Sequence, residues 1–176
     1  MLRSRPGDAS LESHRVGMVA RVNADDIAVA HTPAGGYGAV MPQPVLAGCN
    51  EPLVAGAPDM RGMWRVSSVE WSSGHAPHPD PIADHVERIE QCADRVCITS
   101  SGIIHDMRAD GTVDNGVNDV AAANGQPISV VCTFEDGVHM LRPVGMPGIE
   151  VTRRLDGDTL VWTYGPMFTA RLERIA

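Results

Sequence analysis

Two histidines set in short apolar segments are the side chains of this chain best suited to acid–base chemistry. His105 alternates with Ile103 and Met107, which places its side chain on their face of a predicted strand. His139 alternates with Leu141 in a later segment. An imidazole titrates near neutral pH, so either residue could donate to a bound carbonyl or act as an acid or base. A solvent-facing or internally hydrogen-bonded histidine is the commoner outcome for both.

A first candidate anchor, Glu70, lies on the strand that we expect to begin near Trp64. If Trp64 points inward and no bulge intervenes, alternation also sends Val66, Ser68 and Glu70 inward. An unpaired buried carboxylate is costly, so an inward Glu70 would have to meet a cation such as Arg142 or a ligand. The alternative is a solvent-facing Glu70 at the end of its strand.

A second candidate anchor, Glu51, precedes Pro52 where a Pro-rich and Gly-rich N-terminal segment meets the predicted strands. Its carboxylate could hydrogen-bond a ligand, while the plainer interpretation is a turn residue, because X-Pro dipeptides favour extended turns. Tyr164, on a late strand, adds a rigid aromatic wall with a polar tip.

The histidines of the first long connection do not predict a metal site. This Pro-rich connection carries zinc-ligand residue types at uneven spacing: His75, His78, Asp80, Asp84 and His85. The spacing matches no standard zinc site, so we expect an ordinary loop and no bound metal. The glycines at 35–38 follow no strand pattern and precede no helix pattern, so they are not a dinucleotide fingerprint.

The four cysteines form no C-x-x-C pair. Cys92 and Cys97 flank a predicted tight hairpin, so a disulfide across it is conceivable. Small buried thiols are the expectation for a cytoplasmic protein.

Length and charge restrict the class of protein. The chain has 176 residues, of which 43% are hydrophobic, enough to fill the core of one domain. No apolar run approaches the roughly 18 residues of a membrane helix, and no signal-peptide core follows the N-terminus, so we expect a cytoplasmic protein. A net charge of −8 without a basic stripe argues against nucleic acid or an anionic membrane as partner. We expect a monomer or homodimer.

Residues 59–176 read as one antiparallel β domain. Hydrophobic residues recur with a period near two in ten runs: 63–71, 85–91, 95–100, 102–108, 112–120, 128–134, 138–142, 149–155, 159–164 and 167–175. Asp-Gly pairs at 110–111, 136–137 and 156–157 supply the positive φ that tight hairpins require. A meander of about eight to ten strands exposes its edges unless it closes, so the fold class is all-β, a single up-and-down barrel.

Residues 1–58 are predicted to form an N-terminal arm. Helical spacing favours a short helix over 12–22, and two prolines at 40–48 favour an extended, surface-hugging segment that could cover a barrel mouth. A disordered arm or a simple packing strap is the alternative. The connection 72–83 is a second candidate lid.

The motif Gly62-Met63-Trp64, with Arg171 and Arg174 in the last predicted strand, resembles the closing signature of calycin barrels over residues 60–176. This resemblance implies that Trp64 plugs the barrel floor and that an arginine covers it. Lipocalins, fatty-acid-binding proteins and nitrobindins share the architecture. The nitrobindin pattern of a further Gly and a late haem-ligating His is missing, and 72–83 is too short and Pro-rich for a fatty-acid-binding cap.

A long N-terminal arm on a small barrel also resembles the bacterial cyclases that form spirotetramate or spirotetronate rings by intramolecular [4+2] cycloaddition. This likeness implies a lid over a linear polyene substrate and no cofactor. From its position between lid and barrel, the Glu51 carboxylate could hydrogen-bond an acidic or enolised ring. Cycloaddition needs positioning rather than a nucleophile. The predicted catalytic residues are Glu51, Glu70, His105 and Tyr164.

The predicted substrate-contacting wall combines adaptable and rigid apolar side chains: Met41, Met107, Met140, Trp162, Met167 and Phe168. Taken singly, each is also an ordinary core residue. The function predicted from the sequence is a cofactor-independent cyclase acting on a hydrophobic polyketide-type molecule. The alternatives are a carrier or sensor barrel for a small hydrophobic ligand, and a haem-binding barrel.

Overall fold

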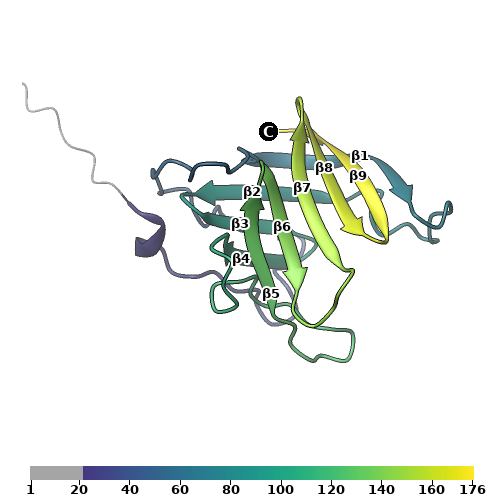
Figure 1. Cartoon of the computed structure of the whole chain (residues 1–176), viewed down its shortest axis with the longest axis horizontal. Coiled ribbons are helices and arrows are strands. Elements are labelled where there is room, and N and C mark those ends of the chain that lie inside the picture. The colour runs from purple at the N-terminus through teal and green to yellow at the C-terminus, as the bar shows by residue number, and fades with distance from the viewer. Residues whose placement is uncertain (1–21) are drawn as a thin grey trace, which may run out of the picture.

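The computed structural model describes residues 22–176, which form an all-β protein with one short 3-10 helix, η1 (Ala24–Asp26). Nine strands follow one another: β1 (Gly62–Trp71), β2 (Val86–Cys92), β3 (Arg95–Ser100), β4 (Ile103–Arg108), β5 (Val130–Glu135), β6 (Val138–Pro143), β7 (Glu150–Asp156), β8 (Thr159–Gly165) and β9 (Phe168–Arg174). They make one sheet in the order β4-β3-β2-β1-β9-β8-β7-β6-β5, in which all paired neighbours are antiparallel. The sheet curls so that β2–β4 cross β6 and β7 at a steep angle (Figure 1).

An irregular segment fills the gap between the two edge strands, β4 and β5. Its backbone bonds to β4 through Arg108 N and Asn115 O at 2.8 Å, and to β5 through Val117 N and Val130 O at 2.9 Å. The fifth predicted strand, 112–120, therefore bonds to both edge strands but is not a regular strand of the sheet. The carboxylate of Asp110 explains this, because it accepts from Thr112 N at 2.9 Å and ties the chain into a local turn. The predicted up-and-down barrel is confirmed as a nearly closed one.

The barrel floor is the predicted closing motif. Trp64 is fully buried and its Nε1–H donates to Met60 O at 2.8 Å. The guanidinium of Arg174 lies over the Trp64 ring, 4.3 Å from the ring centroid, and also donates to Arg61 O. Arg171 does not take part in this closure, contrary to prediction, because it points to the outer face and pairs with Asp156 at 3.1 Å.

A bulge in β1 changes which of its side chains face inward. The pairing of β1 with β9 shifts register between Val66 and Ser68. Beyond the shift, Val69 and Trp71 pack against the core, and Ser68 and Glu70 are exposed. The inward orientation predicted for Ser68 and Glu70 is therefore wrong, because it assumed uninterrupted alternation.

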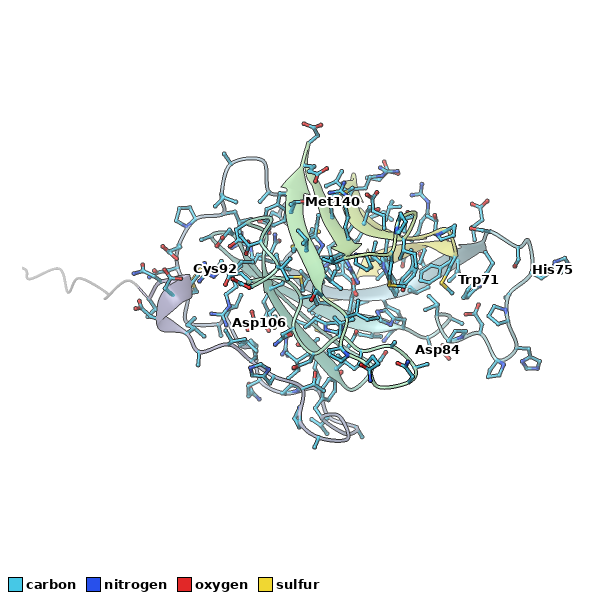
Figure 2. The ribbon with its side chains drawn as sticks, turned by 60° about the horizontal axis from the view of Figure 1, so that its bottom comes forward. Trp71, His75, Asp84, Cys92, Asp106 and Met140 are labelled. Atoms are coloured by element: carbon cyan, nitrogen blue, oxygen red, sulfur yellow. A yellow bond between two sulfur atoms is a disulfide. The ribbon has the colours of Figure 1, made fainter. Side chains whose placement is uncertain are left out.

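Residues 22–58 form a strap on the outer face of β2–β4. Arg95 and Cys97 point outward, since they alternate with the core residues Val96 and Ile98. Buried Arg95 donates to Ala24 O at 2.7 Å and pairs with Asp106 at 2.6 Å. In Figure 2, Cys92 and Asp106 lie on the side of the barrel along which this segment runs.

Further contacts hold the strap along its length. Leu46 N donates to the Glu90 carboxylate at 2.6 Å, and Arg88 donates to Pro42 O at 2.7 Å. Of the arm's alternatives, the packing strap is the one found for 22–58. The helix predicted at 12–22 lies outside the described residues, apart from residue 22, which is not helical.

A disulfide joins the strap to β2. It links Cys49 and Cys92, whose Cα atoms are 6.1 Å apart. The expectation of a thiol is wrong for these two residues, and the conceivable Cys92–Cys97 bond does not form. Cys97 and Cys132 are buried free thiols, as expected, and burial raises the pKa of each to about 12.

The connection after β1 is held at its base. The indole of Trp71 donates to the Asp80 carboxylate at 3.1 Å, and Ile82 packs against the core. Its tip, marked by His75 in Figure 2, projects away from the barrel. No helix in the described part of the chain is long and apolar enough to cross a membrane.

Candidate functional site

A cavity of about 240 Å³ lies inside the barrel, toward the turns that follow β3, β6 and β8. Trp64 lies at the other end, where β1 begins and β9 ends. The inner wall is built from buried apolar side chains, Ile98, Met107, Val117, Val130 and Leu141. Less buried side chains complete the lining on the side toward solvent: Val120, Ile128, Met146 and Ile149. Inward positions from both halves of the sheet therefore enclose a mainly apolar space.

An ion pair lies at one wall of this cavity. Arg153 donates to the Glu87 carboxylate through Nε at 3.0 Å and through Nη2 at 2.9 Å. Burial raises the pKa of Glu87, but Arg153 and a hydrogen bond from His85 outweigh it and hold the pKa at about 2. Glu87 is therefore an anion at neutral pH, and its charge cancels that of Arg153.

His85 connects this pair to the cavity mouth. Its Nε2 lies 3.3 Å from Glu87, and its Nδ1 lies 3.5 Å from the Ser101 hydroxyl. Its ring lies tilted against that of Trp162, with the centroids 4.8 Å apart, and the Arg153 guanidinium lies 5.0 Å from the Trp162 ring centroid. The indole of Trp162 therefore contacts both His85 and Arg153.

His105 contributes an acceptor to the same cavity. Its Nδ1 lies 3.1 Å from Asn118 O, and because a carbonyl oxygen can only accept, Nδ1 carries the hydrogen. Burial lowers the pKa of His105, the bond to Asn118 opposes this, and Arg153 lowers the pKa further. A neutral imidazole protonated on Nδ1 has its lone pair on Nε2, so His105 can accept a hydrogen bond from a ligand.

Two buried polar atoms near the cavity have no partner among residues 22–176. Trp162 lines the cavity, and its Nε1–H is one of them. The other is Nδ1 of His139, whose Nε2 lies 3.2 Å from Cys132 Sγ. Burial, and then Arg153, lower the pKa of His139 to about 3, so it is neutral in the folded protein.

Four of the residues predicted from the sequence meet in this cavity, namely Met107, His105, Trp162 and Tyr164. Phe168 lies behind them in the core, 4.9 Å from the ring centroid of Trp162. Trp162, Tyr164 and Phe168 therefore form an aromatic cluster at this end of the barrel.

The other predicted site residues lie elsewhere. Glu51 accepts from Ala24 N at 2.7 Å and so holds the strap. Met41 lies on the strap and lines a separate surface depression near Tyr37. Met167 is 51% exposed in a turn.

Met140 lies on the outer side of β6, because its neighbours His139 and Leu141 are the buried, inward ones (Figure 2). With Glu70 exposed on β1, the structure does not bring Glu51, Glu70, Met41, Met140 or Met167 to the cavity.

The Glu87–Arg153 ion pair was not predicted, although the alternation of inward and outward residues along the two strands indicates it. Arg153 alternates with Val151 and Leu155, and Glu87 alternates with Ile89, so both charges occupy inward positions. Oppositely charged residues at inward positions of different strands predict a buried pair.

No protein-family model and no curated protein matches the chain. Among solved structures that match is human cRBP IV, a cellular retinol-binding protein, with 16% identity and a TM-score of 0.47. The match covers 66% of this chain and 98% of that one. Independently of that match, the strand order, the nearly closed sheet and the Trp64 floor make this chain an all-β, calycin-like up-and-down barrel.

Proposed function

We propose that the protein binds a small, mainly apolar molecule inside the barrel. The observation that carries this proposal is a mainly apolar cavity, open to solvent at one end and with a few polar groups on one wall, the usual form of a ligand site. Its volume of about 240 Å³ is below the roughly 300–1,000 Å³ typical of drug-sized ligands. A molecule of about ten carbon atoms therefore suits it better than a long chain.

Calorimetric titration with geraniol, an uncharged ten-carbon alcohol, tests the proposal. Ile128→Trp places a large side chain at the solvent side of the cavity, and Val113→Trp adds the same indole at an exposed position away from it. We expect one saturable site in the wild type and in Val113→Trp, and loss of binding in Ile128→Trp. Equal binding by both variants would place the ligand outside the cavity.

The second candidate function is an enzyme, a cyclase of the [4+2] type, rather than a carrier or sensor. A donor on the cavity wall favours it, since a hydrogen bond from Arg153 Nη1 to a conjugated carbonyl would activate that dienophile. The apolar wall would hold the diene against it. A long polyene would need a wider cavity.

Liquid-chromatography mass spectrometry distinguishes these two functions. A product of unchanged mass that forms faster with protein from a linear polyene tetramate or tetronate indicates a cyclase. Saturable binding without a product indicates a carrier or sensor. A haem does not suit the site, because a porphyrin is much larger than a cavity of about 240 Å³.

A further inference from the structure

The polar groups of the cavity wall define the kind of ligand head group that fits. The titratable side chains that line the cavity are those of His85, His105, Arg153 and Tyr164. Glu87 lies directly behind Arg153, and His139 and Cys132 form a deeper buried contact. Asp119, at the surface, also acts on the charge of His105.

The pair of Glu87 and Arg153 leaves the wall without net charge. Both Glu87 oxygens are used by Arg153 in a two-point contact, and Glu87 is completely buried. A ligand carboxylate placed here would meet an arginine that is already neutralised, and it would also lie close to the Glu87 anion. Burying a carboxylate without a free cation is costly.

The same wall offers an acceptor and donors to an uncharged group. His105 Nε2 is an acceptor, because Nδ1 already donates to Asn118 O, and the hydroxyls of Ser100 and Tyr164 belong to side chains that line the same cavity. A donor is Arg153 Nη1, for which no hydrogen bond is found within residues 22–176. A hydroxyl both donates and accepts, so it complements this set, whereas an ether or a carboxylate cannot donate.

We propose that the cavity selects an uncharged ligand that carries a hydroxyl, which donates to His105 Nε2, over the corresponding carboxylate. This inference rests on the proposed binding function. It assigns His105 as the residue that recognises the head group, and Glu87 as the residue that excludes anions.

Three probes with the same ten-carbon chain test the inference: geraniol, its methyl ether and geranic acid. At pH 8 the acid is ionised and imidazoles of ordinary pKa are neutral. We expect geraniol to bind roughly five- to tenfold more tightly than the ether, the size of one hydrogen bond. We expect the carboxylate to bind at least roughly a hundredfold more weakly than geraniol.

Two variants separate the roles of His105 and Glu87. His105→Leu should weaken the binding of geraniol roughly five- to tenfold and leave the affinity for the ether unchanged. His75→Leu, in the exposed loop, should change neither affinity. Glu87→Gln frees the Arg153 charge and should raise the affinity for geranic acid. If Glu87→Gln does not fold, the affinities of the wild type and of His105→Leu for the three probes still test the selectivity for a hydroxyl.

The affinities for the three probes test the selectivity and the binding function separately. Equal affinity of the wild type for geraniol and the carboxylate, or for geraniol and the ether, would overturn the selectivity while leaving the binding function intact. No binding of any probe would overturn the binding function, and this inference with it.

Discussion

At the scale of single residues, the barrel floor depends on the close approach of Gly62 to Arg174. Gly62 has φ +144°, and a Cβ there would lie 2.3 Å from Arg174 Nη1 and 3.0 Å from Ala176 O. We expect Gly62→Ala to lower the free energy of unfolding by roughly 1–3 kcal/mol. Urea denaturation measures this, with Gly48→Ala as control, because Gly48 has an ordinary φ and open space around it. Equal stability of the two variants would contradict the role of Gly62.

Buried His139 should make stability depend on pH. Its pKa is about 3 in the folded protein, against roughly 6.5 in an unfolded chain. As the pH falls from about 6.5 toward 3, the unfolded chain gains a proton that the folded protein does not, so stability falls by up to about 1.4 kcal/mol per pH unit.

His139→Leu should remove this dependence, because leucine does not titrate. Thermal or urea unfolding between pH 7 and pH 5 should show a stability loss smaller by about 1–2 kcal/mol in His139→Leu than in the wild type. His75→Leu, at an exposed site, should retain the wild-type slope. An unchanged slope in His139→Leu would show that His139 is not buried in its neutral form.

Residue identities could be predicted where a motif specifies contacts. Trp64 could be singled out because the Gly-x-Trp motif lies at the start of the first strand, and in the structure it is buried beneath Arg174. The last predicted strand contains two arginines that could cover the floor. Only the register of β9 against β1 shows that Arg174 lies opposite Trp64, whereas Arg171 lies on the outer face. Glu51 and Glu70 were misplaced because a carboxylate's chemistry does not reveal which way it points.

At the scale of elements, the strap, residues 22–58, is bonded to the barrel along its length. The Cys49–Cys92 disulfide closes a chain segment with a sequence separation of 43 residues. Cys49→Ser/Cys92→Ser should therefore lose about 4 kcal/mol of unfolding free energy, from the greater freedom of the unfolded chain. Urea denaturation with and without a thiol reductant measures this loss.

The reductant provides the matched control for the disulfide. It should destabilise the wild type to about the level of the double variant and leave the double variant unchanged. A wild type that is insensitive to reductant under unfolding conditions would contradict a stabilising disulfide.

Strand elements were largely predictable because β-branched residues alternate and Asp-Gly pairs mark the turns. The bulge in β1 was not, since Val66, Ser67 and Ser68 carry no signal for an extra residue. The strap's position was not predictable either. Arg95 and Asp106 look like surface charges in the sequence, yet both are buried, and Arg95 bonds to the strap's carbonyls.

At the scale of the whole molecule, the fold class could be predicted from the number of short strands and from the need to pair the backbone hydrogen bonds at the edges of the sheet. The volume of the cavity could not be predicted, because it is the space that remains after Trp162, Phe168 and the Glu87–Arg153 pair have packed. Such a space depends on side-chain positions in many strands at once.

Methionine methyl NMR tests the central claim most directly. In protein labelled with ¹³C at the methionine methyl groups, Met107 and Met146 report on the cavity, while Met140, on the outer face, and Met167, in an exposed turn, are internal controls. Titration with geraniol should shift Met107 and Met146 along one saturation curve and leave Met140 and Met167 unchanged. A saturating shift of Met140 or Met167 without Met107, or no shift of Met107 at all, would contradict ligand binding inside the barrel.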